Sequence, residues 1–255
     1  MPTLSLNQRD LFYIDHRADV ESLTLLLIHG SASAHAVWPR AFYELSGVRV
    51  VALDLPGHGR SAPPGRRTVA QYAAVIEAFI AELGLQNVVL VGHSMGAAIA
   101  LTAAYQAAVS LRGLILMGAS ARMPVHDNVI NGAMKSLDDV AGFITANGMG
   151  QAAAGTQDDV RRAVLATEPM TVFGDFMACN RFDLRPKLAT IDIPTLIIAG
   201  ELDRMTPLRF SESLAADLPL AKLITLEGVG HFAMLERAAE VRDLIERFVS
   251  DLSQA

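Results

Sequence analysis

Three residues whose side chains could together cleave an acyl bond lie far apart in this 255-residue chain. Ser94 is the centre of the pentapeptide GHSMG (residues 92–96), Asp203 follows an apolar segment, and His231 lies in a glycine-rich loop. A serine hydroxyl is a weak nucleophile until a neighbouring base takes its proton, and an imidazole can accept that proton and later return it. A carboxylate beside the imidazole holds one tautomer and stabilises the charged ring. We therefore predict Ser94 as nucleophile, His231 as base and Asp203 as the orienting acid.

The residues on either side of the pentapeptide make it informative. A glycine-x-serine-x-glycine pattern arises by chance in roughly one chain in ten of this length, at average glycine usage. Here a short β-branched run at 87–91 predicts a strand before it, and an alanine-rich run at 95–110 predicts a helix after it. A serine at such a turn is held in strained geometry, and small flanking residues let two backbones approach. The amides at the start of the helix would face an anion formed there.

Asp203 and His231 each have a plainer interpretation that the sequence leaves open. Asp203 precedes Thr206-Pro207, where a helix is expected to begin with Thr206 as its N-cap, so the acid could serve only that helix. Glu201 is a competing carboxylate, which we expect in solvent. His231 could be a satisfied core histidine, although its glycine-flanked loop after the last expected strand favours catalysis.

Five other histidines carry weaker patterns. His58 lies in a Gly-His-Gly turn and is expected to order a loop, and His93 is expected to pack beside the nucleophile. His16, His35 and His126 have no recognisable partner pattern. We therefore expect none of these five to act as the base.

Strand-like and helix-like segments alternate over most of the chain, which predicts helices packed on a mainly parallel sheet. Strands are expected at 23–28, 48–53, 114–117, 195–199 and 222–226, and helices at 38–45, 68–83, 206–218 and 238–252. Residues 11–14 are expected to add antiparallel strand at the edge. Open α/β sheets bind ligands at the carboxyl ends of their strands, which is where the predicted catalytic residues lie.

The alternation stops between Ser120 and Arg185. Four short helical patterns occur there, near 129–134, 137–145, 160–167 and 172–180, and no convincing strand. We predict a helical insertion at 121–187 that covers the carboxyl edge of a core formed by residues 1–120 and 188–255.

Taken together, these motifs resemble the α/β-hydrolase fold superfamily, in its serine hydrolase branch with a helical cap. The resemblance spans essentially the whole chain, and rests on His29-Gly30, DLPGHGRS (54–61), the pentapeptide, GELD (200–203) and Gly230-His231. It implies a mostly parallel, twisted sheet flanked by helices, and the order serine, acid, histidine. It also implies an oxyanion hole made by the backbone N–H groups of Ser31 and Met95, each typically contributing about 3 to 4 kcal/mol.

The same resemblance narrows the reaction. Serine at position 94 argues against the relatives that use aspartate there, such as haloalkane dehalogenases and epoxide hydrolases. Hydrolysis of an ester, thioester or lactone remains, and so does carbon–carbon cleavage of a vinylogous diketone, whose enzymes Ser31-Ala32-Ser33 matches in part. The peroxidase-like members usually carry an aromatic residue and a proline here, which this chain lacks. A triad-bearing small-molecule receptor or signalling protein is the alternative from a different class.

The insertion is expected to choose the substrate. Its adaptable apolar side chains could line a pocket or pack the insertion on itself, and its arginines could clamp a carboxylate or lie in solvent. The apolar candidates are Met123, Met134, Met149, Met170, Met177, Phe143, Phe173 and Phe176, and the arginines are Arg122, Arg161, Arg162 and Arg181. We expect a small, largely apolar acyl substrate.

Composition excludes several other classes. The chain is 51% hydrophobic and 19% charged with a net charge of −6, which is typical of globular proteins, and its longest basic cluster is Arg66-Arg67, so nucleic-acid binding is not expected. We expect neither a signal peptide nor a membrane span, and a cytoplasmic setting. The single Cys179 allows no internal disulfide. No metal-ligand spacing or phosphate-binding glycine motif appears, so no metal or cofactor is expected, and the oligomeric state stays open.

Overall fold

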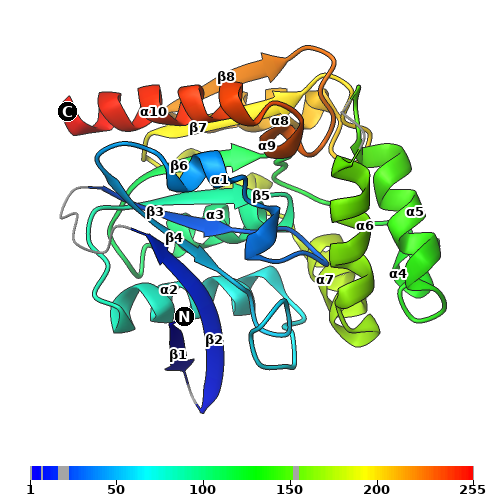
Figure 1. Ribbon diagram of the computed structural model, residues 1–255. Coiled ribbons are helices and arrows are strands. Elements are labelled where there is room, and N and C mark those ends of the chain that lie inside the picture. The colour runs from blue at the N-terminus through cyan, green and yellow to red at the C-terminus, as the bar shows by residue number, and fades with distance from the viewer. Residues whose placement is uncertain (1, 7, 17–22, 152–154, 255) are drawn as a thin grey trace.

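A computed structural model of the chain describes residues 2–6, 8–16, 23–151 and 155–254. Its centre is an eight-stranded sheet in the order β1-β2-β4-β3-β5-β6-β7-β8, drawn in Figure 1. The strands are β1 (Thr3–Leu6), β2 (Arg9–His16), β3 (Leu23–Ile28), β4 (Val48–Leu53), β5 (Val88–His93), β6 (Leu111–Met117), β7 (Thr195–Gly200) and β8 (Ala221–Leu226). From β4 to β8 the pairing is parallel, whereas β1 and β2 pair antiparallel at one edge, as predicted.

The central strands are apolar on both faces because helices cover both faces. In β3, Leu26 and Ile28 pack into one core, and Leu25 and Leu27 into the other. The first core lies under α2 (Val69–Glu82), α3 (Met95–Gln106) and α8 (Leu208–Asp217), and the second under α1 (Arg40–Tyr43) and α10 (Ala238–Gln254). Uninterrupted apolar strands of this kind are the mark of a parallel sheet buried on both sides.

The break in the alternation is a helical insertion, as predicted. Its helices are α4 (Asp127–Gly132), α5 (Leu137–Gly148), α6 (Thr156–Ala166) and α7 (Pro169–Arg181). In Figure 1 they gather at one end of the sheet, beyond the arrowheads of β5 and β6. An antiparallel bridge between Arg122 and Asp183 joins the two chain segments at its base.

Three local predictions are wrong, and each has a backbone reason. The helix expected at 38–45 begins at Arg40, because Pro39 holds Trp38 in extended backbone; a short 3-10 turn, His35–Val37, precedes it. The helix after Ser94 ends at Gln106 rather than near Ser110, because Ala107 adopts the left-handed conformation.

The third error concerns Thr206, which is not the N-cap of α8. Pro207 takes that position, with φ −49° and ψ 144°. The Thr206 hydroxyl instead donates a hydrogen bond to the carboxylate of Asp203, at 2.7 Å. The Thr206 side chain is therefore held by the acid, through a charge-assisted hydrogen bond.

Candidate active site

Ser94 lies in the turn between β5 and α3 in a strained conformation, with φ 53° and ψ −117°. Such a backbone costs a residue other than glycine about 1 to 3 kcal/mol. A Cβ on Gly92 would overlap the backbone of Gly96, and a Cβ on Gly96 would overlap the carbonyl of Ile28 in β3. The structure therefore contains the strained serine turn that the pentapeptide predicts. It also shows why both flanking residues must be glycine.

Asp203 and His231 meet at the carboxyl ends of β7 and β8. The Nδ1 of His231 lies 2.7 Å from Oδ2 of Asp203, and both side chains are buried. The other carboxylate oxygen accepts the backbone N–H groups of Met205 and Thr206, each at 2.8 Å. Asp203 therefore orders the turn before α8 and binds the imidazole at the same time, so it does not serve the helix alone.

The electrostatics of this pair follow from its partners. Burial raises the pKa of Asp203, but the facing imidazole of His231 and the hydrogen bonds from Thr206 outweigh burial and hold the pKa below its ordinary value. Asp203 is thus an anion near neutral pH. An anion at Nδ1 fixes that nitrogen as the proton donor and leaves Nε2 as the basic atom.

The Nε2 atom of His231 is buried and has no hydrogen-bond partner among the described residues. It belongs to a ring that lines the same cavity as Ser94. A hydrogen bond from the Ser94 hydroxyl to Nε2 is therefore not formed in this structure, although the two side chains share one cavity. Catalytic hydrogen bonds are often long in unliganded sites and tighten when substrate binds.

The main chain of His231 is held from two sides. Its N–H donates to the carbonyl of Gly148 at the end of α5, at 2.6 Å. Its carbonyl accepts a hydrogen bond from Nε2 of His93, at 3.0 Å. Burial first, and the nearby His231 second, hold the pKa of His93 well below its ordinary value, so this ring is neutral and packs as expected.

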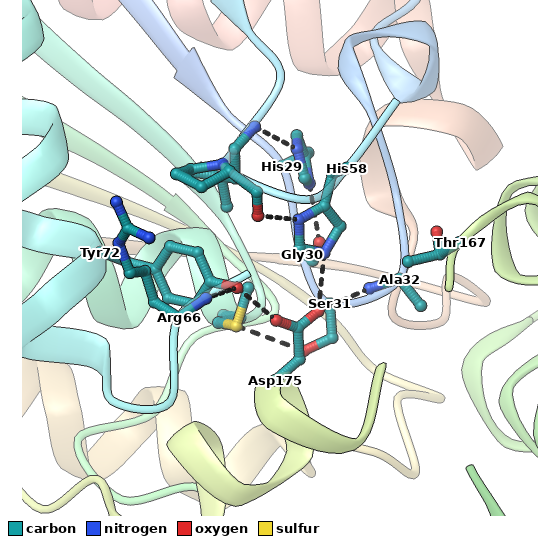
Figure 2. Close-up of polar contacts among 12 residues, drawn as sticks. His29, Gly30, Ser31, Ala32, His58, Arg66, Tyr72, Thr167 and Asp175 are labelled. Atoms are coloured by element: carbon teal, nitrogen blue, oxygen red, sulfur yellow. Dashed lines mark hydrogen bonds and ion pairs between the residues drawn. The ribbon is translucent and has the colours of Figure 1, made fainter. Parts of the chain in front are cut away.

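Ser31 and Met95, the residues implied as oxyanion donors, lie side by side. The Ser31 hydroxyl is 3.5 Å from the sulfur of Met95, and Ser31 also lines the cavity. Ala32, the next residue, has a φ of 50°. His29 holds this loop: its Nε2 accepts the N–H of Leu55 at 3.0 Å, and its Nδ1 donates to Gly30 at 2.8 Å (Figure 2).

The cavity at Ser94 is small and mainly apolar. It has a volume of about 90 Å³, with walls from the serine turn, the loop after β6, α7 and the His231 loop. A second cavity of about 410 Å³ adjoins it and shares Ser31, Ser33, Ile144 and Phe232.

The insertion contributes fewer pocket residues than its composition allowed. Among the predicted apolar candidates, Met123 and Phe176 line the small cavity, whereas Met134, Met170 and Phe143 are exposed. The remaining three, Met149, Met177 and Phe173, pack partly buried against the second core. Of the arginines, Arg122 lines the cavity, Arg161 and Arg162 form exposed ion pairs with Asp138 and Asp159, and Arg181 is exposed.

Cys179 is buried and lines the cavity, so its setting is closer to the site than the sequence suggested. Burial raises the pKa of its thiol to about 12. The thiolate is the nucleophilic form of cysteine, so this side chain has no reactive form near neutral pH.

The sequence did not predict the histidine partners of two acids. Asp175 of α7 is fully buried and lies 2.8 Å from Nε2 of His58, and Asp54 lies 2.9 Å from Nδ1 of His35. A signal for Asp175 was present, because it is the one acid within the apolar run 172–179. Glu201 is exposed, as expected, and its carboxylate accepts the N–H of Gly228.

Within the described ranges, no group of three or more histidine, cysteine, aspartate or glutamate side chains is placed to hold a metal ion. None of the helices in the described part of the chain is long and apolar enough to span a membrane.

Comparison with known proteins identifies the family of the chain. The sequence is 28% identical to 2-hydroxymuconate semialdehyde hydrolase of Pseudomonas putida, over 91% of this chain and 88% of that protein. It is 25% identical to pimeloyl-[acyl-carrier protein] methyl ester esterase of Yersinia enterocolitica, over 88% of this chain and 92% of the relative.

Among solved structures, the enol-lactonase from Burkholderia xenovorans superposes with a TM-score of 0.90 at 21% identity, covering 98% of this chain and 100% of that chain, and so shares the fold. A model of the alpha/beta hydrolase family matches residues 25–244. The mostly parallel sheet, the flanking helices and the insertion α4–α7 are those of the α/β hydrolase fold. Because the family model covers most of its length, this chain belongs to the alpha/beta hydrolase family and is a hydrolase of that fold.

Proposed function

We propose that the protein is a serine hydrolase that cleaves a small, largely apolar ester, thioester or lactone through an acyl-enzyme. The observation that carries this proposal is the buried Asp203–His231 pair, whose free Nε2 lines the same cavity as the strained Ser94. A histidine held by an anion at one nitrogen and left open at the other is suited to move a proton in both directions.

The reaction would begin when substrate brings the Ser94 hydroxyl within hydrogen-bond distance of Nε2. The hydroxyl proton moves to Nε2 while Oγ forms a bond to the carbonyl carbon, and the carbonyl electron pair becomes an oxyanion. The backbone N–H groups of Ser31 and Met95 would bind that oxyanion. Collapse breaks the bond to the leaving alcohol or thiol, which takes the proton from Nε2. Water then repeats the same steps on the acyl-enzyme and releases the acid.

The cavity sets the size of the acyl group. An apolar cavity of roughly 150 Å³ can hold a benzene molecule. The cavity at Ser94, at about 90 Å³, is smaller and has apolar walls that include Met123 and Phe176. An acyl group of a few carbons fits it, and the relative described as a methyl ester esterase supports ester hydrolysis.

We also infer the domain division from the same structure. Residues 121–187 would form the insertion over the site, and residues 1–120 and 188–255 the core. The bridge between Arg122 and Asp183 closes the base of the insertion near both proposed boundaries.

Carbon–carbon cleavage is the second candidate. One relative hydrolyses, by its name, 2-hydroxymuconate semialdehyde, and Arg122 lines the cavity where it could pair with a substrate carboxylate. A panel of aryl esters of increasing acyl length, a lactone and a vinylogous diketone separates the two candidates. Fastest turnover of the shortest esters supports the first, and fastest turnover of the diketone supports the second.

The nucleophile is tested by labelling and by removing its hydroxyl. A fluorophosphonate probe should add one label, at Ser94, and Ser94→Ala should lower kcat by roughly 10⁴-fold or more, as removal of a triad nucleophile does. Labelling at another residue, or full turnover by the variant, would contradict the proposal. Tight binding with a single slow turnover would instead support a receptor.

A further inference from the structure

A second acid and histidine pair lies buried where α7 meets the core. Asp175 of α7 is fully buried, and three donors converge on its carboxylate, as Figure 2 shows. The hydroxyl of Tyr72 donates to Oδ1 at 2.7 Å, while Nε2 of His58 and the backbone N–H of Ala32 lie 2.8 and 3.0 Å from Oδ2. Asp175 therefore connects the insertion with α2, with the loop after β4 and with the loop after β3.

The hydrogen bonds of this pair favour the protonated form of His58. The Nδ1 of His58 lies 3.1 Å from the carbonyl oxygen of Pro56, which can only accept, so Nδ1 carries a proton. Nε2 faces the carboxylate of Asp175 at 2.8 Å, so a proton on Nε2 has an acceptor as well. Burial lowers the pKa of His58, but the charge of Asp175 and the hydrogen bond to it outweigh burial and raise the pKa.

The hydrogen bond between the Asp175 carboxylate and the N–H of Ala32 constrains the loop that would bind the oxyanion. The carbonyl of Gly30 and the N–H of Ser31 belong to one planar peptide unit, and Nδ1 of His29 fixes that unit through the carbonyl, at 2.8 Å. Asp175 fixes the next peptide unit through the N–H of Ala32. The direction of the Ser31 N–H is thus set by the core on one side and by the insertion on the other.

The conformation of Ala32 shows why this loop needs an anchor. Its φ of 50° lies in the left-handed region, which disfavours alanine. A backbone N–H bound by a carboxylate forms a charge-assisted hydrogen bond, roughly twice as strong as a neutral one. The bond to Asp175 can therefore hold Ala32 in a conformation that an unanchored loop would leave.

Helix α7 is seated closely enough to transmit this constraint. A Cβ on Gly174 would come within 2.9 Å of the carbonyl oxygen of Arg66, so the helix lies against the 65–66 segment. The N–H of Arg66 donates a hydrogen bond to the hydroxyl of Tyr72 at 2.9 Å, and that hydroxyl donates a hydrogen bond to Asp175. The helix, the segment and the carboxylate form one packed unit.

We propose that Asp175 is a positioning residue for the oxyanion hole, which anchors the loop at Ser31 and Ala32 to the insertion and to His58. This inference rests on the proposed function, because it requires that the Ser31 N–H bind the oxyanion. Its consequence is that the hole is complete only while α7 is seated on the core.

The test compares Asp175→Ala with Tyr72→Phe. The first removes the acceptor of Ala32, whereas the second removes one donor to Oδ1 and leaves the Ala32 bond in place, so both lose hydrogen bonds in one buried network. With the short aryl ester, Asp175→Ala should lower kcat about tenfold or more with KM within about threefold, since loss of one oxyanion donor costs about 10²- to 10³-fold. Tyr72→Phe should keep kcat within about twofold.

A boronic acid that forms a tetrahedral adduct on Ser94 provides a second measurement. Its inhibition constant would not change if the variant were only less stable. The constant should rise in Asp175→Ala by the same factor by which kcat/KM falls, because adduct and transition state use the same hole. A change in KM alone, or an unchanged boronate constant, would overturn the proposal. So would an equal loss of kcat in the two variants.

A second variant covers the case in which the first does not fold. If Asp175→Ala does not fold, Asp175→Asn serves instead, because its amide cannot accept from all three donors; a kcat loss of about threefold is expected, and unchanged kcat would contradict the inference. The two levels of failure differ in outcome. Absence of labelling at Ser94 removes the proposed function, and this inference with it. Labelling at Ser94 together with full kcat in Asp175→Ala removes the inference alone.

Discussion

Two buried pairs of histidine and aspartate lie near the carboxyl ends of the strands, and they differ in the second nitrogen of the ring. His231 and Asp203 are 2.7 Å apart, and His58 and Asp175 are 2.8 Å apart. In His231 the remaining nitrogen has no partner among the described residues and its ring lines the cavity. In His58 the remaining nitrogen donates to Pro56. An acid beside a histidine therefore does not identify a base; an unoccupied nitrogen beside a substrate cavity does.

The two pairs also differ in which partner has its pKa shifted by the surroundings. At the first pair, hydrogen bonds and the imidazole lower the pKa of Asp203, and the imidazole keeps one nitrogen open for a proton. At the second pair, the carboxylate raises the pKa of His58, and both ring nitrogens have a hydrogen-bond partner. The first arrangement suits proton exchange, and the second suits a fixed charge that holds loops in place.

Exchanging the two histidines for asparagine should separate these roles most clearly. His231→Asn should lower kcat by about 10⁴-fold, since it removes the proposed base, and should change stability less, because Asp203 keeps its bonds from Thr206 and Met205. His58→Asn should cost about 3 to 5 kcal/mol of unfolding free energy, because it leaves the Asp175 charge buried without its ionic partner. Ester turnover and urea unfolding measure the two effects. A similar loss of kcat in both variants would show that the pairs are not functionally distinct.

The fold and the first pair could be predicted from the sequence because local patterns carry them. The apolar run before Ser94 and the glycines around it predict a strand and a tight turn, and both are present. The acid and histidine at 203 and 231 follow short strands, so their place at one sheet edge follows from topology. Their roles in catalysis remain a proposal, to be tested as above.

The second pair could not be predicted, because its partners are set by tertiary packing. His58 and Asp175 are 117 positions apart, and the turn containing His58 predicts only a loop. Whether Asp175 faces the core or the solvent depends on how α7 is seated, and this is decided by contacts such as Gly174 against Arg66. The same limit explains why Thr206 was misplaced: its helix-capping pattern is local, whereas its bond to Asp203 also involves the approach of His231.

A smaller effect is expected where the first pair is weakened but not broken. Thr206→Val removes the hydroxyl that donates to Oδ2 of Asp203 and keeps the backbone bond to Oδ1. A hydrogen bond to a charged group contributes about 1.5 to 3 kcal/mol, so kcat/KM should fall by roughly tenfold while the boronate adduct still forms. Thr206→Ser restores the hydroxyl and should restore most of the rate. If Thr206→Val retains full kcat/KM, the backbone donors alone orient Asp203.

The smallest effect, and the one that places the two pairs in opposite pH ranges, is the change of unfolding free energy with pH. The pKa of His58 is raised in the folded protein above its unfolded value of about 6.5. Its contribution is therefore fully present below pH of about 6.5 and is lost as pH rises through the raised folded pKa. The pKa of Asp203 is lowered, so its contribution is present above the unfolded value of about 3.9 and is lost as pH falls through the lowered folded pKa.

Urea unfolding at several pH values tests this opposition. As pH rises from about 6.5 through the raised folded pKa of His58, the difference in unfolding free energy between the wild-type protein and His58→Asn should narrow, because only the wild-type loses a buried proton there. The titratable neighbours of His58 do not reverse this sign: the pKa of Asp54 is lowered, and burial lowers the pKa of His29 to about 4, so that ring is already neutral. The difference in unfolding free energy between the wild-type protein and Asp203→Asn should narrow only at acidic pH. If the difference in unfolding free energy between the wild-type protein and His58→Asn stays constant with rising pH, His58 is neutral in the folded protein. The two histidine–aspartate pairs would then not differ in charge.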